Sequence, residues 1–329
     1  MNSSKDIQGI VDPLQAKVWD EIQSLGLQSY IAELDVNGYT VIPPELASPD
    51  GLSERLLSAV LDVAERRNGE RPDLIGGSTH TRHQGFTAKL GLPTKEGVDS
   101  PIGDLMQSIL LEDAVFEEAL MNPVLLALAT YLCGYGVILN SMGCFMKGPN
   151  DSPLPLHTDT SFPSPLPPYS LVTNLTYVLT DFNGENGATA VVPGSHKWCR
   201  APLGDETRVK DNPRTVAVEC PAGSLICWHG NLWHGAFNRT APGLRVSIPV
   251  YMARPSVRTQ ESLIGKVPTE VLSRNPARFA ILTHQAIALG WDSYTNSLEG
   301  AKRAAKFQAA WAKELGVPAS AQHPGSLYA

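Results

Sequence analysis

His157 and Asp159 are the residues whose types and spacing first suggest a metal site in this sequence. They stand two positions apart in PLHTDT, residues 155–160. In an extended strand, residues i and i+2 project to the same side, so the imidazole and the carboxylate can face one point in space. This pair alone does not define a site, because ordinary surface pairs have the same spacing. A third ligand downstream is needed.

That ligand can come from GSLICWHGNLWHGAFNRT, residues 223–240, which contains both His229 and His234. From the residues alone, either histidine completes the set. Two histidines and one carboxylate leave three positions of an octahedral metal open, as in the facial triad of non-haem Fe(II) oxygenases. The other histidines of the chain are interpreted as structural: His80, His83, His196, His284 and His323.

Arg245 and Ser247 follow in LRVSIPVY, residues 244–251, where strand alternation predicts that both side chains share one face. A guanidinium presents a planar fork of donors to a carboxylate, and a neighbouring hydroxyl can bind the same group. An isolated arginine on a strand would be interpreted as part of a structural ion pair. Next to a His/Asp/His set, the two residues instead indicate a site for a small carboxylate.

The ordered set of His157, Asp159, a distal histidine and Arg245 resembles the Fe(II)/2-oxoglutarate-dependent dioxygenases, specifically the phytanoyl-CoA dioxygenase family. The resemblance spans about residues 30 to 255. Its supporting segments occur in order: GYTVI (38–42), LTDFNGENGAT (179–189), VVPGSHK (191–197) and PAGSL (221–225). The family's usual separation between the distal ligand and the arginine fits 245 − 234 = 11 and not 245 − 229 = 16. The resemblance therefore favours His234, and His229 is interpreted as a supporting or packing residue.

The resemblance implies a mainly β fold with flanking helices, namely a double-stranded β-helix (jelly roll, cupin-like) with the metal at its mouth. It implies one Fe(II), with 2-oxoglutarate and O₂ as cosubstrates. The metal ligands would be His157, Asp159 and His234, and the residues that bind 2-oxoglutarate would be Arg245, Ser247 and Thr176. Decarboxylation of 2-oxoglutarate to succinate and CO₂ would accompany oxidation of a C–H bond, with hydroxylation as the expected outcome.

Two positions depart from the pattern of some relatives. Leu154 stands where they have glutamine or histidine, and Thr176 stands where an aromatic neighbour of the cosubstrate is common. These differences concern the contacts to 2-oxoglutarate and not the metal ligands. Halogenases built on this fold carry a small residue at the position of Asp159. The carboxylate here therefore predicts hydroxylation, or a related desaturation or ring closure, and no chlorination.

Two other functions keep the fold without oxoglutarate chemistry. A hydrolase or isomerase could hold zinc or another divalent ion in the same site, and a non-catalytic binding protein could retain the metal alone. A small organic molecule is the expected substrate, and no strongly basic cluster near the site favours the phosphates of coenzyme A. The candidate pocket walls are HTRHQGFTAK, residues 80–89, and SFPSPLPPY, residues 161–169.

The chain that must position these side chains changes character twice. We expect one domain over residues 1–329, with a helical N-terminal part (1–135), a jelly-roll core (136–255) and a C-terminal helical extension (256–329). Apolar spacing and capping residues predict helices over 14–31, 53–67, 122–133 and 301–315. Short β-rich segments between turn residues predict strands over 38–43, 137–146, 170–180, 189–192, 215–218, 224–228 and 244–252.

Composition excludes several classes of protein. The 329 residues carry a formal charge of 26 − 33 = −7, so neither a nucleic-acid footprint nor a polybasic membrane patch is expected. The longest apolar run, 123–133, is shorter than the ~20 residues of a membrane span. The N-terminus lacks a secretory pattern. Five cysteines without a CxxC pair predict neither a zinc framework nor a disulfide scaffold. We expect a cytoplasmic monomer or homodimer.

Overall fold

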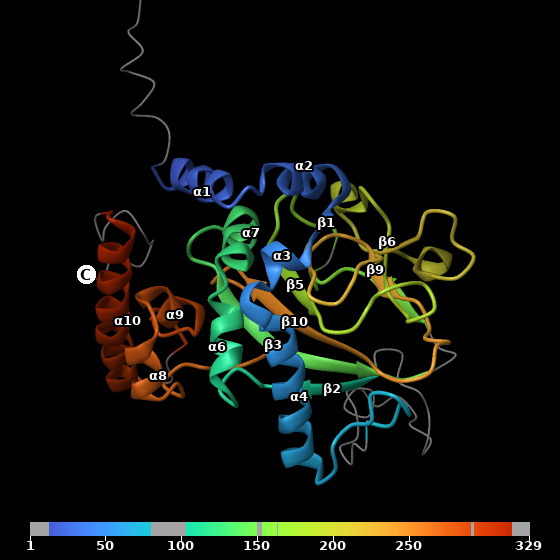
Figure 1. Cartoon of the computed structure of the whole chain (residues 1–329). Helices are drawn as coiled ribbons and strands as arrows, with labels where there is room; N and C mark the ends of the chain where they lie inside the picture. Colours follow the sequence, from blue (N-terminus) through green and yellow to red (C-terminus); the bar gives the residue numbers. More distant parts are fainter. Residues whose placement is uncertain (1–12, 80–102, 150–152, 163, 291–292, 318–329) are drawn as a thin grey trace, which may run out of the picture.

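Two antiparallel sheets pack against each other in the computed structural model, which describes residues 13–79, 103–149, 153–162, 164–290 and 293–317 (Figure 1). The larger sheet has the order β1-β8-β5-β10-β3-β2 and the smaller one β4-β9-β6-β7. The strands are β1 (Tyr39–Ile42), β2 (Asp104–Gln107), β3 (Ile138–Lys147), β4 (Leu154–His157), β5 (Val172–Val178), β6 (Thr189–Val191), β7 (Val216–Ala217), β8 (Leu225–His229), β9 (His234–Ala236) and β10 (Arg245–Ala253). This arrangement is the predicted jelly roll.

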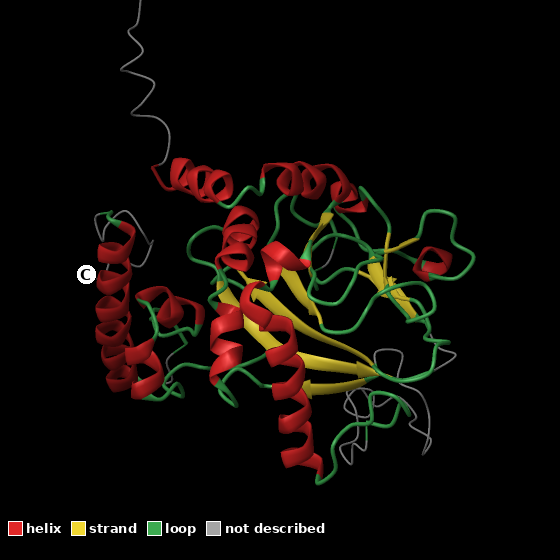
Figure 2. Cartoon of the chain, in the orientation of Figure 1, coloured by secondary structure: helices red, strands yellow, loops and turns green. Residues whose placement is uncertain are grey.

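Helices cover the outer face of the larger sheet, and a second group of helices lies beside it (Figure 2). The N-terminal helices are α1 (Pro13–Ser24), α2 (Gln28–Asn37), α3 (Pro44–Ala47), α4 (Leu52–Asn68), α6 (Ala114–Leu120) and α7 (Pro123–Cys133). The C-terminal helices are α8 (Thr269–Arg274), α9 (Ala277–Leu282) and α10 (Tyr294–Leu315). Short 3₁₀ turns occur at Pro49–Gly51, Ser195–Trp198 and Gly204–Thr207.

Strand β5 shows how the larger sheet separates core from site. Leu175 and Tyr177 are fully buried on the face that packs against the helices, and the Tyr177 hydroxyl donates to the Ala119 carbonyl at 2.8 Å. Asn174 and Thr176 alternate with them and line a pocket on the opposite face. The period-2 pattern of a strand thus places apolar residues toward the helices and polar ones toward the smaller sheet.

The N-terminal helices differ in detail from the predictions. The helix expected over 14–31 is two helices, because Gly26 adopts a left-handed φ of +68° between α1 and α2. Helix α4 begins at Leu52 after Gly51, one residue before the predicted start. The prediction for α7 is confirmed, since the Asn122 side chain accepts from the first turn and the helix ends at Gly134.

The sheet extends beyond the core range predicted from sequence, which was 136–255. Strand β1 pairs with β8, and β2 pairs with β3, so two strands come from the first 135 residues. Strand β1 was expected, but β2, β4 and β9 were not. Each of those three has only three or four residues, which is too short for alternation to identify it without its partner.

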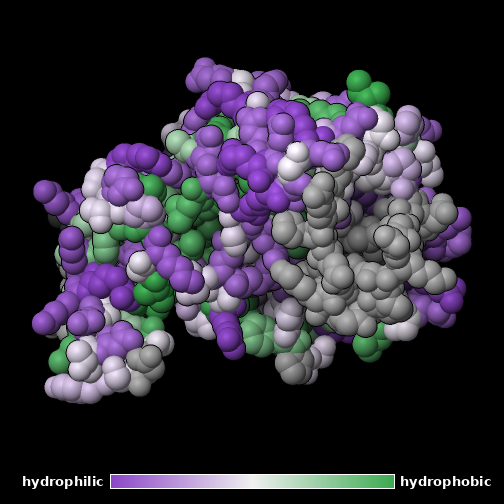
Figure 3. All heavy atoms as spheres, turned by 90° about the horizontal axis from the view of Figure 1, so that it is seen from below, coloured by the Kyte–Doolittle hydropathy of each residue, from purple (hydrophilic) through white to green (hydrophobic). Residues whose placement is uncertain are grey.

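The C-terminal helices attach to the body through a separate apolar cluster in which Tyr135 and Trp311 have ring centroids 6.4 Å apart. Viewed from below, the described surface is mostly hydrophilic, and hydrophobic residues gather where these helices meet the body (Figure 3). Within the described ranges, no single helix is long and apolar enough to cross a membrane. Helices α6 and α7 reach that length and composition only together, across a bend of 48°.

Candidate active site

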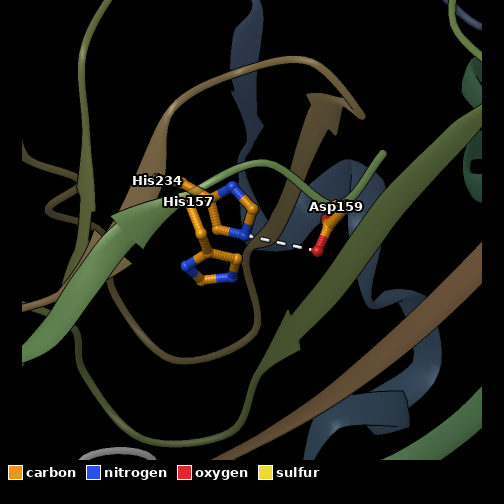
Figure 4. Close-up of side chains that lie close together, drawn as sticks. All are labelled: His157, Asp159 and His234. Carbon is orange, nitrogen blue, oxygen red and sulfur yellow. Dashed lines mark ion pairs between the residues drawn. The ribbon is translucent and has the colours of Figure 1, made fainter. Parts of the chain in front are cut away.

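The two histidines of the candidate site lie directly opposite each other on paired strands. His157 ends β4 and His234 begins β9, and the two are register partners with ring centroids 4.3 Å apart. Asp159 follows β4, and its Oδ1 lies 3.5 Å from His234 Nε2. The candidate ligand atoms of the three residues all lie within 4.8 Å of one another (Figure 4). The structure therefore brings together the three side chains singled out from the sequence.

Backbone carbonyls orient both imidazole rings. Nδ1 of His157 lies 2.9 Å from the Pro155 carbonyl, and Nδ1 of His234 lies 3.0 Å from the Leu232 carbonyl. A ring that donates from Nδ1 keeps an unprotonated Nε2, the form that binds a metal. In both cases the partner is the carbonyl two residues earlier, so a local side-chain to backbone contact fixes each ring.

Two aromatic side chains of the larger sheet hold Asp159. The Trp228 indole Nε1 donates to Asp159 Oδ2 at 2.9 Å, which leaves Oδ1 facing the histidines. The Tyr251 hydroxyl donates to the Asp159 backbone carbonyl at 3.0 Å. These bonds link β8 and β10 to the segment after β4. They fix the carboxylate before any ligand binds, as expected of residues that support a metal site.

Burial and mutual charge set the protonation states. Burial lowers the pKa of His157 to about 4, and the neighbouring His234 acts in the same direction. Burial alone would lower the pKa of His234, but the Asp159 carboxylate raises it above its ordinary value. Burial alone would raise the pKa of Asp159, but the histidines and Trp228 bring it below its ordinary value. Near pH 7 the site thus offers an ionised carboxylate and a neutral His157, which are metal-binding forms.

A cavity of about 470 Å³ contains this cluster, a size typical of small-molecule sites. All the site residues predicted from the sequence line it: His157, Asp159, Thr176, His234, Arg245 and Ser247. Thr176 donates to the Asn174 side chain at 3.1 Å. Ser247 is buried between register partners Val178 and Phe145. The expectation that Arg245 and Ser247 share a face is confirmed.

Arg245 is a buried cation that retains an unused donor. Its side chain stacks 4.7 Å from the Phe182 ring centroid, and Nη1 donates to the Gly187 carbonyl. Its Nε is buried without a hydrogen-bond partner among the described residues. Burial lowers its pKa to about 10, and nearby Arg239 adds to the effect, yet the group remains charged at neutral pH. A buried guanidinium with a spare N–H suits a carboxylate ligand.

The structure also separates His196, His229 and His284 from this cluster. His229 lies at the end of β8 and accepts from the Asn231 backbone N–H at 3.0 Å, with its ring 5.3 Å from that of His196. His284 was expected within a helix, but it follows α9 with a φ of +71° and bonds the Leu139 carbonyl. Among the candidate pocket walls, Ser161 lines the cavity. The segment 80–89 and His323 lie outside the described residues.

Several lining residues were missed from the sequence. Tyr251 belongs to the same strand as Arg245 and Ser247, so continued alternation along β10 could have found it. Trp228 immediately precedes His229 and could have been paired with Asp159 only in three dimensions. Glu261 lies beyond the last strand, where no pattern identifies it. All three line the cavity.

Sequence comparisons identify relatives of the chain. The model of the family described as phytanoyl-CoA dioxygenase (PhyH) matches residues 34–247. "Dioxygenase af480" of Aspergillus fumigatus is 31% identical over 163 residues, covering 48% of this chain and 51% of the relative. "Dioxygenase FUM3" of Gibberella moniliformis is 30% identical over 130 residues, covering 38% and 41%. The chain thus spans about half the length of the curated relatives it matches.

Solved structures share the fold. HygX from Streptomyces hygroscopicus, crystallised with nickel and 2-oxoglutarate bound, superposes with a TM-score of 0.53 at 16% identity, covering 71% of this chain and 89% of that one. EvdMO1 gives a TM-score of 0.51 at 22% identity, covering 69% and 50%. These similarities support the jelly-roll fold. Because the family model matches well over half of the sequence, the chain belongs to the phytanoyl-CoA dioxygenase family.

Proposed function

We propose that this protein is an Fe(II)/2-oxoglutarate-dependent dioxygenase that hydroxylates a C–H bond of a small organic molecule. One observation carries the proposal. A His/Asp/His cluster and a buried arginine with a spare donor line the same cavity. The cluster suits a divalent metal with open positions, and the arginine suits the carboxylate of a cosubstrate.

In this proposal, His157, Asp159 and His234 hold Fe(II), while Arg245 and Ser247 bind the distal carboxylate of 2-oxoglutarate, with Thr176 nearby. When bound, the iron with 2-oxoglutarate and O₂ supplies the oxidising power, and succinate and CO₂ are the coproducts. The residues of the chain bind and orient: the Nδ1 contacts fix the two imidazoles, and Trp228 fixes the carboxylate. Burial of the site limits water around the reacting groups.

The comparisons support this proposal. The chain's family is named for a dioxygenase, and several curated relatives carry that name. HygX, which shares the fold, was crystallised with nickel, 2-oxoglutarate and hygromycin B bound. A small-molecule substrate for this chain agrees with the volume of the cavity.

The direct test measures succinate formation and O₂ consumption with Fe(II), 2-oxoglutarate and a panel of metabolites. We expect succinate formation that requires both Fe(II) and 2-oxoglutarate. The competing hydrolase or isomerase, like a binding protein, would show no 2-oxoglutarate turnover under any condition. The spare donor on Arg245 favours the oxygenase, because a structural ion-pair arginine would have a carboxylate partner.

Product analysis tests the role of the carboxylate. Because Asp159 is held with one oxygen facing the histidines, we expect it to fill the position that a halide would need. Reaction of the enzyme in excess chloride under air should therefore add oxygen to the substrate, or remove hydrogen from it, without adding chlorine. Mass spectrometry of the product distinguishes these outcomes, and a chlorinated major product would contradict the assignment.

Trp228→Phe tests the support given to Asp159. The phenyl ring keeps most of the packing but removes the donor to Oδ2, so the carboxylate loses one of its restraints. Substitutions of such supporting partners typically weaken metal binding by about 10- to 100-fold. We expect a rise in this range in the Fe(II) dissociation constant, measured by anaerobic titration. Trp233→Phe is the matched control, because its indole bonds the Arg200 carbonyl instead.

A further inference from the structure

One end of the cavity carries a row of polar side chains, of which Asn174 and Ser141 have no part in the proposed mechanism. Trp228, Asn174, Tyr251 and Ser141 are successive register partners across β8, β5, β10 and β3. Directly opposite residues of an antiparallel sheet share a face, so all four side chains project toward the cavity. Trp228 and Tyr251 bond Asp159, so this row of side chains borders the candidate metal site.

The row lies away from the proposed anchor of 2-oxoglutarate. Arg245 precedes Tyr251 by six residues on β10, which corresponds to roughly 20 Å at ~3.3 Å per residue. The Tyr251 hydroxyl bonds the Asp159 backbone near one end of this strand, and the Arg245 side chain lines the cavity from the other end. The polar row is thus the part of the described cavity left for the substrate.

Glu261 extends this polar end beyond Ser141. The Ser141 hydroxyl donates to the Gln260 side chain at 2.8 Å, which places the segment after β10 beside β3. Glu261 Oε1 accepts from the backbone N–H groups of Ser108 at 3.2 Å and Met142 at 3.1 Å. These two bonds fix the carboxylate at the cavity wall. The Ser108 side chain also forms a hydrogen bond with the Glu261 carboxylate.

The charge of Glu261 is held by hydrogen bonds and has no ion-pair partner in the described part of the chain. Apart from the histidines, three acidic or basic side chains stand among the described lining residues: Asp159, Arg245 and Glu261. Asp159 belongs to the metal cluster and Arg245 to the proposed carboxylate site, so Glu261 is the one without an assigned role. Arg67, the one cation that acts on it electrostatically, is ion-paired with Glu112 at 2.6 Å. The side-chain oxygen of a glutamine could accept the same two N–H bonds. These bonds therefore explain why an acceptor oxygen stands at this position, but they do not require a negative charge.

Retaining this charge costs stability. Burial raises the pKa of Glu261, while the hydrogen bonds from Met142 and Ser108 and the charge of Arg67 oppose that effect. A partly buried carboxylate without a cation is unfavourable unless a ligand supplies one. An ionisable residue in a cleft whose pKa is shifted by burial is a candidate functional position.

We propose that Glu261 is a specificity-determining residue that binds a protonated amine of the substrate, and that the substrate is a small hydroxylated amine. This inference rests on the proposed function for its placement beside the metal site. Asn174, Ser141 and Gln260 supply donors and acceptors for neighbouring hydroxyls. An anionic substrate, such as a phosphate ester, would be repelled by Glu261.

Three probes of one carbon skeleton test the preference: glucamine (cationic), glucitol (neutral) and gluconate (anionic). Their affinities for the full chain are measured by ligand-observed NMR at neutral pH, with Zn(II) present so that no turnover occurs. We expect glucamine to bind about tenfold more tightly than glucitol, the effect of one charge-assisted hydrogen bond, and gluconate to bind weakest. Equal binding of glucamine and glucitol, or no binding of either, overturns the proposal.

Substitutions assign the preference to Glu261. Glu261→Gln keeps the acceptor for the two N–H bonds and removes the charge, so it should lose the tenfold preference. Gln260→Glu, at an exposed neighbouring position, should strengthen it. Glu270→Gln makes the same charge change on the exposed surface of α8 and should leave it unchanged. An undiminished preference in Glu261→Gln contradicts the assignment.

The experiment separates this inference from the proposed function. Probe binding is read without turnover, whereas the dioxygenase assignment is read from succinate formation with Fe(II) and 2-oxoglutarate. Succinate formation without an amine preference would reject the substrate class alone. An amine preference without 2-oxoglutarate turnover would reject the dioxygenase alone.

Discussion

Replacing His234 by alanine will abolish stoichiometric Fe(II) binding. The substitution removes one of three proposed ligands whose donor atoms lie within 4.8 Å of one another, and it leaves Asp159 without the imidazole that lowers its pKa. The two remaining candidate ligands, at the end of β4 and just after it, cannot replace the third. Anaerobic Fe(II) titration followed by metal analysis measures the loss, and circular dichroism with thermal unfolding checks that the fold is retained.

His229→Ala is the matched control for this prediction. The two histidines lie in the same segment and are both buried, but His229 bonds the Asn231 backbone, and its ring lies 5.3 Å from that of His196. We expect His229→Ala to bind one equivalent of Fe(II) with little change in affinity. Loss of the metal in His229→Ala together with its retention in His234→Ala would show that the ligand assignment is wrong.

Arg245→Ala will raise the KM for 2-oxoglutarate by about 10- to 100-fold, the effect of losing a charge-assisted hydrogen bond worth about 1.5–3 kcal/mol. The guanidinium is buried on the cavity wall, and the structure offers no second arginine there among the described lining residues. Initial rates of succinate formation over a range of 2-oxoglutarate concentrations measure the change. Direct binding to the Zn(II)-loaded protein confirms that the change is in affinity.

Arg239→Gln is the corresponding control. Arg239 is also buried, but its donors go to the backbone carbonyls of Gly243, Asn186 and Pro242. If Arg239→Gln lowers the stability of the protein, the fraction of active enzyme should fall, but the KM for 2-oxoglutarate should change little. Arg245→Lys replaces the two-pronged guanidinium donor by a single ammonium group. It keeps the positive charge and should recover part of the affinity for 2-oxoglutarate. An unaltered 2-oxoglutarate affinity in Arg245→Ala would place the anchor elsewhere.

The sequence predicted side-chain directions and helix ends correctly where they depend only on neighbouring residues. The spacing of His157 and Asp159 requires only an extended strand end to bring both side chains to one side, and the structure shows their ligand atoms close together. Asn122 and the following proline similarly mark the start of α7, because capping involves only adjacent residues. Alternation along β10 placed Arg245 and Ser247 on the cavity face.

Pairing between distant segments could not be obtained in this way. Strands β4 and β9 have four and three residues, and each is a strand because the other lies beside it. The register that places His157 opposite His234 is therefore determined by the pairing of the two strands, and neither segment determines it alone. From the residues alone, His229 and His234 were equal candidates, and only the family resemblance favoured His234. In the structure, that histidine is the one opposite β4.

The types of the chemical groups and their local orientation were thus determined by the sequence itself: a His/Asp pair on an extended segment, a distal histidine, and an arginine with a hydroxyl on one strand face. Tertiary structure decided which groups share the cavity. It brought Trp228 and Tyr251 from two strands of the larger sheet onto Asp159, and it placed Glu261 against the backbone of Met142. Such contacts join residues tens to more than a hundred positions apart, where side-chain periodicity carries no information and only the closure of the two sheets fixes the distance.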